Sequence, residues 1–481
     1  MHRKKAKKLL LMALVLGGSA AANAQTQNQD TWSLQECIDY AIKNNLQVRQ
    51  SQNTAQLNEV DYKQARAAIL PTVNGNASGG INFGSSIDPI TSEFRTEQIK
   101  SSNFSVSSGV TLFAGRQIQN RIAQTKLSSE AGMLDAEKTK NDVILNIVTA
   151  YMQVIFAEEL LQTAQLQLNT TQTQAERTEK LFTAGSVAEG SLLEIQAQVA
   201  TDELAIINAQ NQKAQAELQL IQLLDLDNAE NFEVEKPELP EPDQAVITFD
   251  ANQVYEAAKQ NLPEIKSADT KVKAAVKGVD VAKGAYYPRL TLSGSIFTGY
   301  SSARSLFQQG TGLVAQPLGF TDETGSQTIT VYRPQTITTN YAFGDQFNDN
   351  LGKSLNLSLN IPIFNGFQSR YGVSRARIGL RNAEIASEIA KNQLRQQVQQ
   401  AYADALAAQK KYTAAKKQLN ALERSYRNAE IRFNAGVLNT TDFNVAANNY
   451  RRAQSEIIQA KYDFIFKLKI LDFYQGKPLS F

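Results

Sequence analysis

The chain has 481 residues, of which 42% are hydrophobic and 20% are charged, and its formal net charge at pH 7 is +2. This composition supports a folded core, and the near-neutral charge gives no electrostatic footprint for nucleic acid. A single histidine and a single cysteine exclude zinc clusters, Ser-His-Asp or Cys-His nucleophile systems and disulfides within the chain. A lysine- or carboxylate-based enzyme stays open, but no motif supports one, so we expect no enzyme, no metal site and no cofactor.

Residues 1–24 have the three parts of a secretory signal peptide. Basic side chains gather in 1–8, a short apolar run follows, and the segment ends in an A-x-A cleavage pattern at 22–24. We expect cleavage before Gln25. The alternative, an N-terminal membrane anchor, needs a longer apolar run. Beyond residue 24 no stretch approaches about 20 apolar residues, so any membrane-spanning part of the mature chain is predicted to consist of β-strands.

The mature chain contains two copies of one unit. Each opens with a helical segment carrying Asn-Leu, at 45–46 and 261–262, and each segment continues to a lone proline, Pro71 or Pro288. We expect a first repeat at 25–226, with a hairpin at 72–113 and a tip turn at 183–191, a proline-rich linker at 227–246, and a second repeat at 247–481, with a hairpin at 290–363 and a tip turn at 434–442.

Each hairpin contains two segments in which apolar and polar residues alternate, most clearly from Leu355 to Ile361. The connections at 84–102 and 301–352 are polar and rich in Gly and Ser, so we expect loops there. Such strands are typical of membrane barrels, although a soluble hairpin packed on a core is the alternative. Four strands cannot close a barrel, because the smallest outer-membrane barrels have eight. If these strands span a membrane, several chains must share one barrel.

The two 70-residue segments that follow the hairpins contain no proline and predict very long helices with a coiled-coil seam. Large residues alternate with alanine-sized ones at the seam positions, which are Val143, Ile147, Ala150, Val154, Ala157, Leu161, Ala164, Leu168, Thr171, Ala175, Thr178 and Phe182 in copy one and Leu394, Val398, Ala401, Ala405, Ala408, Tyr412, Ala415, Leu419, Leu422, Tyr426, Ala429 and Phe433 in copy two. An ordinary amphipathic bundle is the alternative. The return segment after the first turn is predicted to pack through Leu193, Ala200, Ile207, Ala214 and Ile221. Cys37 is expected to be a half-buried helix residue.

This order of elements resembles the TolC family of outer-membrane efflux and export proteins. The resemblance rests on the duplicated opening helix with its Asn-Leu, the prolines before strands one and three, the Phe-x-Gly motifs at Gly115 and Gly366, and the Phe-x-x-Gly motifs at Gly185 and Gly436. It implies a mainly α fold with a β-barrel part. Each chain would supply a long antiparallel coiled coil and four membrane strands to a homotrimer with a shared 12-stranded barrel.

The resemblance also implies a passive exit duct of a tripartite efflux or type I secretion system. The duct would lie among outer-membrane lipid, extend into the periplasm, and work with a periplasmic adaptor (membrane fusion) protein and an inner-membrane pump. It does not indicate whether drugs, metal ions or proteins pass. The alternative function is a non-conducting coiled-coil structural protein of the periplasm or cell surface, and the alternating hairpins favour the duct.

By resemblance, the turns at the far helix ends form the periplasmic tip, where the adaptor docks and the tunnel narrows. The expected docking residues are Gly185, Ser186, Val187, Gly436, Val437 and Leu438, and the expected aperture residues are Asp442, Glu189 and Glu194. The alternative for these acidic residues is ordinary stabilisation of helix starts. Leu438 stands where family members carry a basic latch residue, so the latch of this chain must differ.

Overall fold

The computed structural model describes residues 31–87, 92–95, 98–226, 232–237, 249–320 and 328–477. The expected signal peptide and most of the expected linker lie outside these residues. The described residues belong to two compact units, a first unit within 1–51, 136–262 and 393–481 and a second unit within 52–135 and 263–392. Both units therefore contain residues from both halves of the chain.

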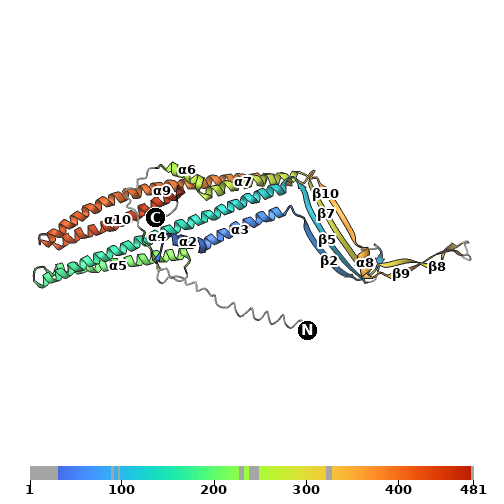
Figure 1. Ribbon diagram of the computed structural model, residues 1–481, viewed down its shortest axis with the longest axis horizontal. Helices are drawn as coiled ribbons and strands as arrows, with labels where there is room; N and C mark the ends of the chain where they lie inside the picture. The colour runs from blue at the N-terminus through green and yellow to red at the C-terminus, as the bar shows by residue number, and fades with distance from the viewer. Residues whose placement is uncertain are drawn as a thin grey trace, which may run out of the picture. The chain divides into compact units, whose positions relative to one another are not determined.

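The second unit contains the four predicted strands, and they form one antiparallel sheet (Figure 1). The strands are β2 (Thr72–Asn82), β5 (Ile99–Ala114), β7 (Arg289–Ser301) and β10 (Gly352–Asn360). Their order is β10-β7-β5-β2, so the hairpin of each copy joins that of the other through β5 and β7. The two outer strands, β10 and β2, each keep one edge without a partner strand in the described chain.

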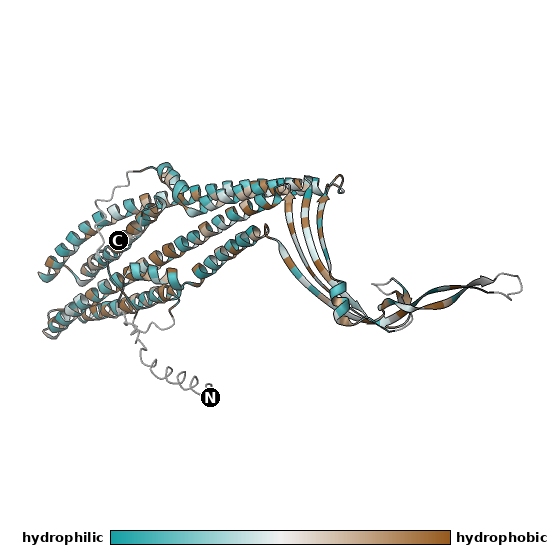
Figure 2. Cartoon of the chain, turned by 45° about the vertical axis from the view of Figure 1, so that its right-hand side comes forward, coloured by the Kyte–Doolittle hydropathy of each residue, from teal (hydrophilic) through white to brown (hydrophobic). Residues whose placement is uncertain are grey.

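One face of this sheet is apolar and the other is polar, as the alternation predicts. Pairing places Val106 opposite Ile296 on the apolar face and Ser107 opposite Ser295 on the polar face. The apolar face is open, with Leu357 64% exposed. Figure 2 shows the alternating hydropathy along the strands. An uncovered apolar face on a two-faced sheet fits a lipid environment rather than a soluble core.

The two connections expected to be loops contain further structure. The first carries a short hairpin, β3 (Ser86–Ile87) and β4 (Phe94–Arg95), and the second carries a long two-stranded ribbon, β8 (Ser305–Phe320) and β9 (Thr328–Asn340), followed by helix α8 (Phe343–Asp349). The expectation of plain loops was therefore wrong. The β-branched run in β9 favours a strand, and the glycines nearby masked that signal.

The opening helix of each copy is two helices rather than one. In copy one they are α2 (Leu34–Asn44) and α3 (Leu46–Ala67), and in copy two α6 (Ala251–Asn261) and α7 (Pro263–Lys283). The break falls at the Asn-Leu motif. Asn45 accepts hydrogen bonds from the backbone N–H groups of Gln47 and Val48 and so caps the start of α3, while Pro263 begins α7 without needing a backbone donor.

Four long helices follow the hairpins. They are α4 (Gln117–Thr183), α5 (Glu189–Leu224), α9 (Gln368–Asn434) and α10 (Thr440–Tyr474). The 67 residues of α4 and of α9 correspond to about 100 Å of helix at 1.5 Å per residue. In the second unit α7 forms an ion pair with α4 and another with α9. Lys271 of α7 lies 2.8 Å from Asp135 on α4, and Asp269 of α7 lies 2.7 Å from Lys391 on α9.

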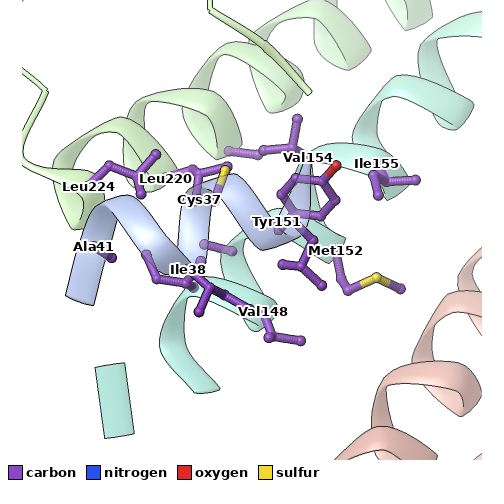
Figure 3. Packing of buried hydrophobic residues seen from close by; sticks show 14 of the residues in the cluster. Cys37, Ile38, Ala41, Val148, Tyr151, Met152, Val154, Ile155, Leu220 and Leu224 are labelled. Atoms are coloured by element: carbon purple, nitrogen blue, oxygen red, sulfur yellow. The ribbon is translucent and has the colours of Figure 1, made fainter. Parts of the chain in front are cut away.

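The main core of the first unit surrounds Cys37, which is fully buried rather than half-buried. Figure 3 shows its thiol beside Leu220 and near Tyr151. Burial raises the pKa of Cys37 to about 12, so the thiol is unreactive at neutral pH. The hydroxyl of Tyr151 donates to the backbone oxygens of Trp32 and Glu235, which flank the parallel pair β1 (Thr31–Trp32) and β6 (Glu233–Val234).

The predicted seam of the long helices is confirmed in the part away from the turns, but toward the turns most of its residues are only half-buried, and Phe182 is 38% exposed. In copy one the seam residues from Val143 to Leu161 are all buried, and Thr171 and Thr178 are buried further along. In copy two the buried set runs from Leu394 to Ala415. Small residues at alternate seam positions therefore sit where these helices pack.

The predicted stripe of the return helix α5 was wrong. Leu193 and Ile207 are 57% and 52% exposed, and the buried stripe is Ile195, Asp202, Ala209, Ala216, Leu220 and Leu224. The predicted stripe and the buried residues from Ile195 to Ala216 both have seven-residue spacing. The predicted residues from Leu193 to Ala214 are exposed, whereas Ile221 is half-buried against the core. The exposed stripe thus remains available to another copy of the chain.

One described helix contains a stretch apolar enough to cross a membrane by length and composition, contrary to expectation. It lies within α4, and half of the stretch is buried inside the protein. A core helix of a helical bundle has the same composition, so this stretch is weak evidence for a membrane-spanning helix.

The buried seam predicts the effect of enlarging Ala408. This residue is 4% exposed and packs in a cluster with Tyr412, Ala460 and Phe464. Ala408→Leu should overpack the cluster and lower the free energy of unfolding by about 1–3 kcal/mol. Ala407→Leu, at an exposed position of the same helix, should change it by less than about 0.5 kcal/mol. Denaturant unfolding of both variants measures the difference, and equal values would refute the seam.

Candidate functional site at the helix turns

The tip of the first unit, defined as turns 184–188 and 435–439 with the helix ends beside them, is built from the same motif twice. At the end of α4 the N–H groups of Gly185 and Ser186 donate to the carbonyl oxygens of Phe182 and Leu181, both at 2.8 Å. These two hydrogen bonds form a Schellman motif, which needs a residue in the left-handed conformation directly after the helix. Gly185 supplies it with φ of +72°.

The end of α9 repeats this arrangement. The N–H groups of Gly436 and Val437 donate to Phe433 and Arg432, and Gly436 has φ of +74°. In the described part of the chain, no atom beyond the adjacent residues lies within 4 Å of where a Cβ would sit at Gly185 or Gly436. The requirement for glycine is therefore conformational, and the space around both turns is open.

The two return helices start differently. Asn439 caps α10 by accepting from the N–H of Asp442 at 2.8 Å, and its amide donates to the Asp442 carboxylate at 2.9 Å. In copy one the cap position is Ala188, whose side chain makes no capping bond, and Gly190 lies in the first turn of α5. The copy-one hairpin therefore begins its return helix with weaker local stabilisation.

The structure places all three expected aperture residues at the tip of the first unit, and a hydrogen bond links the neighbourhoods of two of them. Glu194 accepts from the hydroxyl of Thr441 at 3.4 Å, and Thr441 precedes Asp442 in α10. Both carboxylates are exposed. Glu189 is exposed at the first position of α5. Asp442 thus has a capping role in this chain, and its exposed side chain remains free to face another copy.

A cavity of about 920 Å³ lies between the two hairpins at the tip. Four of the expected docking residues line it: Ser186, Val187, Gly436 and Leu438. Across it, Arg177 on α4 donates to the side-chain oxygen of Asn434 on α9. The two copies are therefore joined at the tip by an arginine of α4, although position 438 carries leucine.

A second connection between the hairpins was missed by sequence reasoning. Asp202 on α5 is buried and accepts from Thr171 on α4 at 2.5 Å and from Gln198 at 2.8 Å. Arg451 on α10 lies 3.5 Å from Asp202 and donates to Thr171 at 3.1 Å. The side chains of Asp202 and Arg451 are 7% and 16% exposed. Their ion pair, together with Thr171, thus links α4, α5 and α10, which come from both copies.

The electrostatics of this pair show that burial is costly. Desolvation lowers the pKa of the Arg451 guanidinium, and Asp202 opposes that change. The Nε of Arg451 is buried without a hydrogen-bond partner in the described part of the chain. The sequence did contain a signal, because Asp202 lies seven residues from both Ile195 and Ala209 and so shares their face of α5. The prediction that the Leu193 stripe is the buried one concealed this signal.

The acidic residues of the tip form no metal site in the structure. Among the described residues, no group of three or more His, Cys, Asp or Glu side chains is arranged to hold a metal ion. The tip offers paired helix turns, exposed carboxylates and a cavity with both polar and apolar lining residues.

The model of the family described as outer membrane efflux protein matches residues 37–225 and 254–472. The chain belongs to this family. Its two matched segments correspond to the two copies, which supports the internal duplication. The protein is accordingly an efflux protein of the outer membrane with a periplasmic extension, and its family and fold point away from an enzyme.

Relatives and solved structures agree with this assignment. The efflux protein is 24% identical to Protein CyaE of Bordetella pertussis over 90% of this chain and 80% of that one. It is 25% identical to Outer membrane protein TolC of Escherichia coli over 71% of this chain and 63% of that one. A crystal structure of CusC, at 16% identity, superposes with a TM-score of 0.73 over 92% of both chains.

The buried ion pair gives a testable consequence for this efflux protein. Arg451→Met would leave the Asp202 carboxylate buried without its cation and should lower the free energy of unfolding by about 3 kcal/mol. Arg452→Met removes the neighbouring, exposed arginine and should cost less than about 0.5 kcal/mol. Unfolding monitored by helix signal compares the two, and similar losses would mean that the pair does not stabilise the helices.

Proposed function

We propose that three copies of this efflux protein form one passive export duct. Each copy contributes β2, β5, β7 and β10 to a 12-stranded barrel in the outer membrane, and the long helices form a periplasmic tunnel. The observation that carries this proposal is the sheet itself, which has an apolar face and two free edges. Unpaired backbone groups at these edges would cost several kcal/mol each in lipid, so the edges must pair with other copies.

The chain directions suit such closure. Neighbouring strands within the sheet are antiparallel throughout, so β2 and β10 run in opposite directions. When β2 of one copy meets β10 of the next, the new pair is antiparallel as well. Three copies then give an even-numbered, alternating barrel, which is the arrangement of bacterial outer-membrane barrels.

Exposed apolar stripes on the helices support the same assembly. On α5, Leu193, Leu204, Ile207 and Leu218 are each more than half exposed. They are 11, 3 and 11 residues apart, which places them on one face of the helix in a heptad pattern and predicts a helix of another copy as the partner. In the second unit, Ile378, Ile385 and Ile389 on α9 and Leu57 and Val60 on α3 are exposed too.

The polar face of the sheet suits a water-filled lumen. It carries Thr72, Asn74, Asn76, Asn103, Ser105, Ser107, Ser293, Ser295, Ser354, Asn356 and Ser358. Among the residues of the four strands, Arg289 is the charged side chain on this face, and it lies at the strand end that joins the helices. A neutral hydrophilic lining conducts solutes without a strong charge preference, so discrimination would rest on the tip and on the partners.

The tip would dock a periplasmic adaptor, while an inner-membrane pump supplies the energy. Open space around Gly185 and Gly436, and the turns that present Ser186, Val187, Val437 and Leu438, support this role. The structural-protein alternative does not explain a two-faced sheet with an exposed apolar side.

Mass and conductance measurements test the duct. The purified chain in detergent should have about three times the mass of the mature chain and should conduct in a planar bilayer. Leu204→Asp places a charge in the exposed α5 stripe and should weaken the trimer, whereas Gln210→Asp, exposed on another side of α5, should leave it intact. A stable monomer, or a tight oligomer without conductance, would contradict the proposal.

The aperture has its own test. Threefold symmetry would place three Asp442 carboxylates around the tunnel axis, where oxygen ligands attract divalent cations. Asp442→Ala should reduce block by divalent cations added from the periplasmic side by about tenfold or more and change resting conductance only modestly. Asp39→Ala, at an exposed position of α2, is the control. Unchanged block in Asp442→Ala would leave Asp442 with its capping role alone.

A further inference from the structure

The ribbon β8–β9 is the largest feature of the chain that the duct does not use. It contains 16 and 13 residues in its two strands, and Figure 1 shows it extending past the end of the four-stranded sheet where α8 lies. The connection between the end of β7 and the start of β8 is only three residues long. The ribbon therefore belongs to the extracellular rim of the proposed barrel.

The base of the ribbon is held firmly. Gln346 of α8 is fully buried, its side-chain oxygen accepts from the N–H of Ser301, and its amide donates to the backbone oxygens of Ser301 and Tyr341, all within 2.8–3.0 Å. Thr298 of β7 donates to the backbone oxygen of Phe347 at 2.7 Å. These bonds join α8 to both ends of the ribbon and fix the direction in which it leaves the sheet.

The ribbon itself is unsupported. An isolated two-stranded hairpin is marginally stable in water, and both outer edges of this one lack a partner strand in the described chain. Phe307 and Leu313 of β8 pair with Thr338 and Pro334 of β9. These two partners and Tyr332 are an even number of residues apart along β9, so Phe307, Leu313 and Tyr332 lie on one face of the ribbon. Each of these three side chains is 66% exposed.

A matching apolar group lies on the other connection of the sheet. Phe83 follows β2 directly, and Ile87 and Phe94 belong to the paired strands β3 and β4. Their exposures are 78%, 53% and 80%. Monomeric soluble surfaces rarely gather large apolar side chains in this way without a partner.

The topology decides which copies meet. Within one chain the β2–β5 and β7–β10 connections belong to opposite edges of the sheet, whose order is β10-β7-β5-β2. In the closed ring, β2 of one copy pairs with β10 of the next. The hairpin β3–β4 of the first copy then stands at the seam beside α8 and the ribbon of its neighbour.

We propose that the ribbon face of Phe307, Leu313 and Tyr332 binds the β3–β4 hairpin of the adjacent copy through Phe83, Ile87 and Phe94. This contact forms an extracellular clasp across each seam of the trimer. The inference rests on the proposed trimer, but its contact is separate from the barrel strands and the helices. A lipid surface is the less suitable partner, because both connections follow the strand ends on the side away from the helices and the strand order places them at the same seam.

Cysteine cross-linking of the full-length protein in outer membranes tests the clasp. Phe94→Cys is combined in turn with Phe307→Cys, Leu313→Cys or Tyr332→Cys, and copper phenanthroline is the oxidant. Because each copy contributes one cysteine to each of two seams, at least one pair should give covalent dimers and trimers on non-reducing gels. Native Cys37 is buried and does not compete.

Two controls locate the contact. Gln316→Cys lies on the opposite face of the ribbon, opposite Val331, and should cross-link to Phe94→Cys at least fivefold less than the best pair. Single-cysteine variants should remain monomeric on the gel. Absence of cross-linked species for all three pairs, or disulfides that form only within one chain, would overturn the clasp.

Failure of the clasp and failure of the duct can be told apart. The same variants are measured for detergent mass and for bilayer conductance. Trimers that conduct but never cross-link would reject the clasp alone, whereas a monomeric parent protein would reject the trimer as well. A second measurement uses trimer melting: Phe94→Asp and Tyr332→Asp should each lower it, and the double variant should lose little more than the larger single loss. Additive losses would contradict a direct contact.

Discussion

The backbone hydrogen bonds at the edges of a four-stranded sheet are the constraint on which the other features depend. A lipid environment offers no water to satisfy the free N–H and C=O groups of β2 and β10, so a single chain cannot keep this sheet in a membrane. The same sheet is too narrow to close on itself. Assembly is therefore a condition for the membrane-embedded state, and the apolar stripes on the helices belong to the same requirement.

The return helix α5 has one stripe that packs within the chain and a second stripe that suits the assembly of several chains. Its buried stripe, from Ile195 to Leu224, uses alanines and one aspartate and packs within the chain. Its exposed stripe carries leucine and isoleucine at Leu193, Leu204, Ile207 and Leu218. A helix in a closed ring has neighbours on two sides, and two stripes at different angles are what a helix needs to meet both. The more hydrophobic stripe is exposed on the single chain, as the proposed contact with another copy requires.

Much of the fold follows from local patterns in the sequence. Alternation located the four strands within a few residues, and proline-free heptads located α4 and α9 and their seam. The Phe-x-x-Gly motifs located two turns whose Schellman bonds require a left-handed glycine. These features depend on neighbouring residues alone, so a single sequence is enough to find them.

Other features depend on which surface meets which, and a single sequence does not encode that directly. Hydrophobicity favoured the wrong stripe on α5, because it cannot distinguish packing within a chain from packing between chains. The ion pair of Asp202 and Arg451 joins residues almost 250 positions apart, and each appears alone as an ordinary helix charge. The helix break at Asn45 was missed because its side chain caps α3 only when the backbone has already turned there.

The two copies differ in how their return helices begin at the tip. Copy two starts its return helix with the reciprocal bonds of Asn439 and Asp442, whereas copy one starts with Ala188, which has no such bond. The hairpin with the weaker start is held to the other copy at the tip by Arg177 with Asn434 and further back by Asp202 with Arg451. Local opening occurs most readily where local stabilisation is least. The copy-one return helix therefore begins with less local stabilisation, while the buried pair joins the helices behind it.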